Sequence, residues 1–137
     1  MRSAAARAVL ALLALATAAL AAGERPALRG VTAIRLANYN SPSVLYQSRD
    51  QVSSIVSELN TLRRRVWQGG DTKLACYSTL VALAGKKTLG TFRILPEHIV
   101  EHEGPRGVPV YSLELRPGDL PLISRLLGEI QPAKDCD

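Results

Sequence analysis

The segment His98-Ile-Val-Glu101-His102 contains residue types that bind and activate zinc. Two histidines and a glutamate in the order His-x-x-Glu-His form the inverted motif of some zinc proteases. Chelation requires a helix, in which residues four apart share one face about 6 Å apart along the axis. In a strand the same histidines would stand about 13 Å apart. Because Pro96 and Gly104 leave room for barely one helical turn, we expect a solvated strand without a metal ion, and a zinc-dependent hydrolase is the alternative.

Cys76 and Cys136 are the only two cysteines. A reactive thiol and a metal-binding pair are the alternatives to a disulfide, but the wide spacing supports neither. An even number of cysteines in an exported chain favours one intramolecular bridge. The chain-entropy model gives about 4 kcal/mol for a closed loop of about 60 residues. Because Cys136 is the penultimate residue, we expect this bridge to hold the C-terminal tail in place.

Two polar segments are candidate interaction surfaces. The densest positive patch consists of Arg63, Arg64, Arg65 and Trp67, and a polar loop contains Asn38, Tyr39 and Asn40. The patch fits an acidic partner, and the alternative is a solvated helix end, where cations are favoured by the helix dipole. The loop has a composition suited to protein contact, and the alternative is a simple connector. With 4% aromatic residues for base stacking, no nucleic-acid partner is expected.

Other catalytic patterns are missing from the sequence. No glycine spacing of a phosphate-binding or dinucleotide-binding loop occurs, and no Gly-x-Ser-x-Gly elbow is present. The only two histidines lie together at 98 and 102, so a serine–histidine–aspartate arrangement would have to use one of them. We therefore expect a non-enzymatic protein without a cofactor.

The N-terminal residues predict export. Arg2 and Arg7 precede an uncharged run from Ala8 to Ala22, and Ala19-Leu20-Ala21 forms a small-x-small cleavage motif. A membrane span needs about 20 apolar residues, so we expect cleavage after Ala21 and no integral membrane protein afterwards. Residues 1–21 are thus a signal peptide, 22–30 a flexible lead-in segment and 31–137 one small domain. Without Arg2 and Arg7, the mature chain has 15 basic and 12 acidic residues.

The pattern of the remaining chain predicts two helices and a sheet. Six apolar residues at helical spacing follow the capping-box sequence Ser48-Arg-Asp-Gln51: Val52, Ile55, Val56, Leu59, Leu62 and Val66. A second helix follows Asp119, which suits an N-cap, and ends before Pro132. Segments with β-forming residues predict strands over 31–37, 74–84, 88–95, 99–100 and 108–115. We expect one hairpin to join 74–84 to 88–95 through the turn Gly85-Lys86-Lys87, and a second to join 99–100 to 108–115 through the loop 104–107.

This order predicts an α+β fold, a two-layer sandwich. We expect a largely antiparallel sheet of four to five strands with two amphipathic helices on one face. With 47% hydrophobic and 21% charged residues, the domain can build a packed core. The function expected by exclusion is a small periplasmic or secreted binding or accessory protein that contacts another envelope or secreted protein. A structural envelope protein that self-associates through a sheet edge is a further alternative. The composition of the export segment favours a bacterial source.

Overall fold

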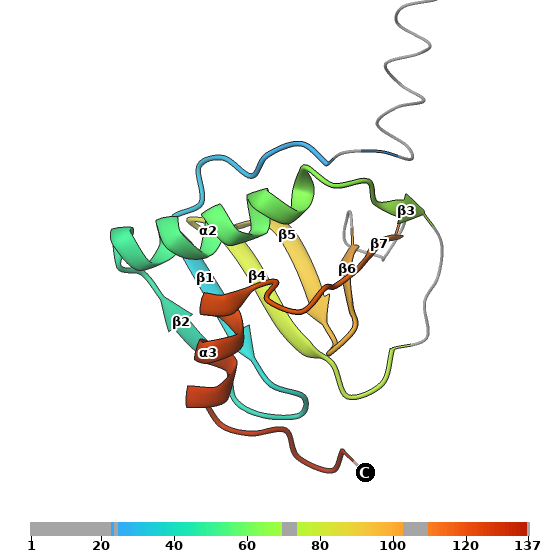
Figure 1. Cartoon of the computed structure of the whole chain (residues 1–137). Coiled ribbons are helices and arrows are strands. Elements are labelled where there is room, and N and C mark those ends of the chain that lie inside the picture. The colour runs from blue at the N-terminus through green and yellow to red at the C-terminus, as the bar shows by residue number, and fades with distance from the viewer. Residues whose placement is uncertain (1–22, 24, 70–73, 103–109, 137) are drawn as a thin grey trace, which may run out of the picture.

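The strands form one antiparallel sheet of seven, in the order β2-β1-β4-β5-β6-β7-β3. The computed structural model describes residues 23, 25–69, 74–102 and 110–136. The strands are β1 (Ala33–Ala37), β2 (Val44–Tyr46), β3 (Gln68–Gly69), β4 (Ser78–Ala84), β5 (Lys87–Ile94), β6 (His98–His102) and β7 (Val110–Glu114). Helices α2 (Arg49–Arg63) and α3 (Pro121–Glu129) both cover the same face of the sheet (Figure 1). The predicted α+β class is therefore confirmed.

The predicted sheet of four to five strands was too small. The structure adds β2, with three residues, and β3, with two. Strands this short show no alternation that distinguishes them from a loop. They occupy the two ends of the sheet, so the central strands have the predicted pairing and only the edges differ.

β4 and β5 form the hairpin that the sequence predicts, and the structure places it in the middle of the sheet. β4 pairs with β1 on one side and with β5 on the other. Gly85 in the turn has a φ of +59°, a left-handed conformation that glycine adopts without a steric penalty. The paired residues Ile34 and Ala82 continue to Gly90 of β5, and all three lie on the face that packs against the helices.

Helix α2 buries the predicted apolar stripe except at its end. Val52, Ile55, Leu59 and Leu62 are buried. Val66 is 66% exposed, because the helix ends at Arg63 and residue 66 no longer lies on the stripe. Ser48 occupies the N-cap position as predicted, but its side chain makes no capping hydrogen bond, so the capping box does not form.

Helix α3 is capped by a residue of α2 rather than by Asp119. Leu120 occupies the N-cap position with a φ of +53°. The carboxylate of Glu58 accepts hydrogen bonds from the backbone N–H groups of Leu122 at 2.5 Å and Ile123 at 3.0 Å. A carboxylate at a helix N-terminus also interacts favourably with the helix dipole. Glu58 lies outside the apolar stripe of α2, and its contact with α3 fixes how the two helices meet.

The segment predicted to lead flexibly into the domain packs against α2. Leu28 is 9% exposed and belongs to the hydrophobic core. Its N–H donates to the Asn60 side-chain oxygen at 2.8 Å, and its carbonyl accepts from the Asn60 amide nitrogen at 3.2 Å. The packed part of the chain therefore begins before residue 31, because the Leu28 side chain is buried in the core and Asn60 binds both the N–H and the carbonyl of Leu28.

The cap on α3 can be tested by replacing Glu58 with glutamine. Glu58→Gln removes the charge and one of the two strong acceptors, so we expect the free energy of unfolding to fall by about 1 kcal/mol. Urea denaturation followed by circular dichroism measures this change. The control is Glu129→Gln, since Glu129 makes only an exposed pair with Arg125 at 3.7 Å, and its cost should stay within about 0.5 kcal/mol. Equal losses in the two variants would contradict the interhelical cap.

Candidate functional site

The His-x-x-Glu-His segment forms a strand, β6, as the sequence predicts, but the prediction that this strand is solvated was wrong, because β5 and β7 pair with its two sides and Ile99, Val100 and Glu101 are buried. Glu101 pairs across the sheet with Phe92 and Tyr111, both of which belong to the core on the helix-covered face. His98 and His102 lie on the opposite face, because successive side chains of a strand alternate. The three candidate zinc ligands therefore do not converge on one point. Within the described residues, no group of three or more His, Cys, Asp or Glu side chains is placed to hold a metal ion.

Glu101 instead forms a buried ion cluster with two arginines. Its carboxylate is 3% exposed, and both of its oxygens accept from Nη1 of Arg63 at 2.6 Å. Nε of Arg25 lies 3.5 Å from Oε1. The guanidinium of Arg25 stacks 3.7 Å from the ring centroid of Tyr111. Nε of Arg63 donates to the carbonyl of Pro26. The cluster therefore joins the N-terminal segment, the end of α2 and strand β6.

This arrangement divides the predicted positive patch. Arg63 is only 5% exposed and Trp67 only 1%. The indole N–H of Trp67 donates to the carbonyl of Leu62 at 2.9 Å, which makes it a core anchor. Arg65 is paired with Asp119 at 2.6 Å, and Arg64 is exposed. The four residues 63–65 and 67 therefore do not form one continuous surface, because the end of α2 turns two of them into the core.

Asp119 connects the end of α2 with the loop before α3. Burial raises the pKa of this carboxyl, but hydrogen bonds from the backbone N–H of Arg116 and from Arg65 outweigh it, so the pKa lies below its ordinary value. The charged carboxylate is thus the form that the fold favours.

The predicted interaction loop is tied to other parts of the domain. The Asn38 side-chain amide donates to the carbonyls of Leu127 at 2.8 Å and Gln131 at 2.9 Å. Its oxygen accepts from the hydroxyl of Ser78 at 2.8 Å. Asn38 therefore joins the end of β1 to the start of β4 and to the end of α3. This is a structural role for a residue that the sequence assigned to a surface.

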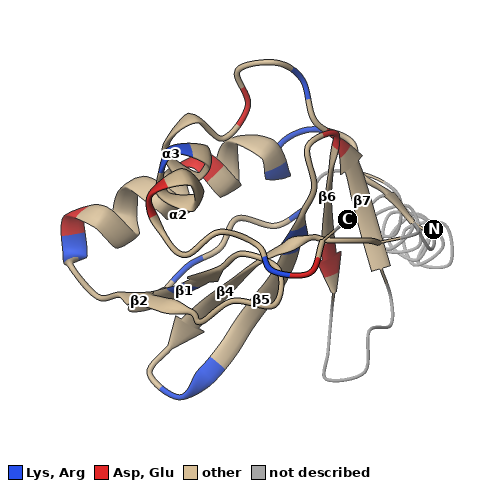
Figure 2. Cartoon of the chain, turned by 90° about the horizontal axis from the view of Figure 1, so that it is seen from below, with Lys and Arg blue, Asp and Glu red and all other residues tan. Residues whose placement is uncertain are grey.

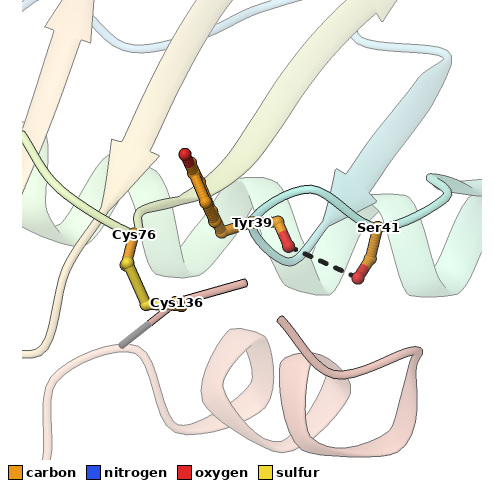
Figure 3. Close-up of a disulfide and its surroundings, with 4 residues drawn as sticks. All are labelled: Tyr39, Ser41, Cys76 and Cys136. Atoms are coloured by element: carbon orange, nitrogen blue, oxygen red, sulfur yellow. Dashed lines mark hydrogen bonds between the residues drawn. A yellow bond between two sulfur atoms is a disulfide. The ribbon is translucent and has the colours of Figure 1, made fainter. Parts of the chain in front are cut away.

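The C-terminal tail covers the rest of this loop. Cys76 and Cys136 form the predicted disulfide, with their Cα atoms 5.6 Å apart (Figure 3). Lys134 donates its backbone N–H to the carbonyl of Tyr39 at 3.0 Å, and Asn40 donates to the carboxylate of Asp135 at 3.3 Å. The tail is held where the sequence predicts, and it occupies the polar groups of the loop that a partner would need.

Strand β2 is the exposed feature that the sequence analysis missed. Val44 is 37% exposed and Leu45 is 45% exposed. Only one other large hydrophobic side chain among the described residues, Val66, is exposed as much. As the last strand of the sheet on its side, β2 presents one row of backbone groups to solvent. The β-forming run Val-Leu-Tyr after Pro42 is the only signal in the sequence that could have revealed it.

Exposed arginines lie next to β2 in the sheet and along the chain. Arg35 is paired directly with Leu45 and shares its face of the sheet. Arg29 and Arg49 are also exposed, and no ion pair involves any of these three arginines within the described residues. Basic residues of β1 and of the start of α2 appear as blue segments of the ribbon in Figure 2, where the sheet and the helices form two separate layers. Asp50 lies in the first turn of α2, and burial together with the negative charge of Glu129 raises the pKa of Tyr46 in β2.

A shallow groove lies near the same side of the domain. Its volume is about 470 Å³, and it is lined by Leu28, Gly30, Val31, Thr32, Gln47, Arg49, Val52, Ser53 and Val56. Its lining combines apolar and polar residues of α2, of the segment that leads into β1 and of the connection between β2 and α2.

Comparison with protein-family descriptions, with curated proteins and with solved structures found no match to this chain. Neither described helix has the length and apolar character that a membrane span requires. What the protein binds is therefore inferred from the surface of the domain itself.

The buried ion cluster can be tested at its central residue. Glu101→Gln leaves two buried guanidinium groups without their carboxylate, so we expect the free energy of unfolding to fall by about 3–5 kcal/mol. Chemical denaturation measures the change, and Glu114→Gln on the neighbouring strand β7 is the control. Glu114 is exposed, so its replacement should cost less than about 0.5 kcal/mol. A loss below 1 kcal/mol for Glu101→Gln would show that the cluster is not a constraint on the fold.

The Asp119 contacts predict a specific loss of stability in acid. Because the folded pKa lies below the ordinary value of 3.8, the stabilisation is complete above that value and is lost as pH falls through the folded pKa. We expect the difference in unfolding free energy between the wild type and Asp119→Asn to be constant from pH 5 to 7 and to shrink below about pH 4. The second variant, Arg65→Met, should reduce the same pH-dependent part. A difference that grows in acid would contradict this assignment.

Proposed function

We propose that this chain is a small exported protein without catalytic activity that binds another exported protein through the free edge of β2. The single observation that carries the proposal is the exposure of Val44 and Leu45 on a terminal strand whose outer edge has no partner strand within the described residues. Val44 and Leu45 lie on opposite faces of β2, so a partner strand at this edge would meet one exposed apolar side chain on each face. An unpaired strand edge adds a row of backbone donors and acceptors to which a partner can bind.

The roles of the other candidate residues support this choice by elimination. Arg63 and Glu101 stabilise the core, Arg65 and Asp119 join two segments, and Asn38 joins three elements. Each of these residues has its charge or hydrogen-bonding groups satisfied inside the domain. Arg64 and Val66 are also exposed, but β2 combines exposed apolar side chains with neighbouring arginines and a free strand edge.

Export is part of the proposal. The signal-like N-terminus predicts it, and the disulfide between Cys76 and Cys136 is consistent with folding in an oxidising compartment. Such a compartment is also where an envelope or secreted partner would be met. The periplasm and the extracellular space share this chemistry, and we propose one of the two as the site of function.

Site-specific photo-crosslinking in the native cells tests the proposed surface. A benzophenone amino acid in place of Leu45 should give a defined adduct with another protein, because this side chain points to solvent at the edge. The matched control places the same amino acid at Lys86, at the exposed tip of the β4–β5 turn, where no adduct is expected. Mass spectrometry identifies the adduct.

Two results would overturn the proposal. Adducts of equal yield from both positions would indicate contact without a preferred surface, and no adduct at position 45 would remove the edge as a binding site. An adduct with twice the mass of the chain would instead favour the structural alternative, in which copies of this protein associate through the edge.

A further inference from the structure

We infer that the partner presents an extended segment that pairs with β2 as an additional strand, and that this segment combines apolar side chains with carboxylates. The inference rests on the proposed function, because it specifies what the edge binds. Three properties of the edge carry it: its backbone, its two apolar faces and its charge.

The backbone of β2 selects an extended partner. β2 pairs with β1 through Ile34–Tyr46, Arg35–Leu45 and Leu36–Val44, and within the described residues no strand pairs with its other side. A strand added on that side would satisfy the N–H and C=O groups that now face solvent. A helix has no free backbone groups along its length with which to do this.

The exposed side chains select alternating residues in the partner. Val44 shares the helix-covered face with Leu36, whereas Leu45 lies on the opposite face beside Arg35. An added strand places its own side chains alternately on these two faces. One face therefore offers contact with Val44, and the other offers Leu45 with a guanidinium next to it.

The charge of the edge selects carboxylates. Arg29, Arg35 and Arg49 are exposed and make no ion pair within the described chain, whereas Asp50 lies beside Arg49 and Glu129, which acts on Tyr46, is paired with Arg125. The local surplus is positive. Arg35 is one strand removed from the edge, and its long side chain shares a face with the added strand. An acidic residue on that face would be attracted to it.

The same properties disfavour a second copy of this chain. A strand of three residues spans about 10 Å, so pairing two copies through β2 alone would bury far less than the roughly 1,200 Å² of a stable interface. Two copies would also bring their arginines to the same edge, where like charges repel. A foreign acidic segment meets neither obstacle, because it can extend beyond β2 and carries the complementary charge.

Panning a displayed library of random nonapeptides on the oxidised mature chain tests the inference. We expect the recovered sequences to be rich in alternating apolar residues with aspartate or glutamate. A synthetic peptide with a recovered sequence should bind about tenfold more weakly to the double variant Arg35→Glu/Arg49→Glu. The double variant Lys86→Glu/Lys87→Glu makes the same change of charge at the β4–β5 turn, where β4 is separated from β2 by β1, and it should bind within twofold of the wild type.

The backbone part of the inference has its own measurement. N-methylation of alternate amides of the recovered peptide removes the donors of one strand edge, and we expect one of the two methylation patterns to abolish binding. Nuclear magnetic resonance should show the largest amide shifts at residues 44–46. Binding that survives both patterns, or shifts centred elsewhere, would overturn strand addition.

The outcomes separate this inference from the proposed function. If Leu45 cross-links to a foreign protein but the recovered peptides lack carboxylates or are insensitive to Arg35→Glu/Arg49→Glu, the inference fails and the proposed function stands. If no peptide is recovered and no adduct forms at position 45, both fail. Concentration-dependent dimers with shifts at residues 44–46 in the absence of peptide would overturn the acidic partner in favour of a second copy.

Discussion

The carboxylate of Glu101 is the constraint on which the domain depends. It lies on the core face of β6, where an unpaired charge would be strongly destabilising, and Arg63 satisfies both of its oxygens. Arg63 reaches it because α2 ends there, and Arg25 reaches it because the N-terminal segment crosses the end of α2. The backbone N–H of Arg25 donates to the carbonyl of Arg63 at 2.8 Å, so the cluster also orients the segment that brings the second arginine.

Two further polar residues and the disulfide repeat this principle elsewhere. Glu58 joins α2 to α3 through backbone amides, and Asn38 joins the sheet to the end of α3. The bridge from Cys76 to Cys136 then fixes the tail that follows α3. Each contact connects segments that are far apart in sequence, which a small core cannot align by apolar packing alone, since such packing is not directional.

The sequence was sufficient for the parts of the fold that are periodic. The stripe of α2, the β4–β5 hairpin and strand β6 follow from residue spacing, and the disulfide follows from the count of cysteines. The role of a polar residue could not be predicted, because it depends on what the fold places opposite it. In the sequence, Arg63 fits a cation at the solvated end of a helix. Its buried role depends on Glu101, which the fold places opposite it on β6. Likewise, β2 is too short to produce an alternating residue pattern, so the sequence does not reveal the exposed edge on which the proposed function depends.

The two edges of the sheet differ in a way that stability does not explain. Proteins protect terminal strands by making them short and polar, and β3 follows this rule with Gln68 and Gly69. β2 is equally peripheral, yet it exposes Val44 and Leu45. An exposed apolar edge exposes a protein to aggregation, and like charges on the arginines beside β2 oppose contact between two copies. The apolar side chains and the arginines of this edge are consistent with the proposed binding of a different, acidic partner.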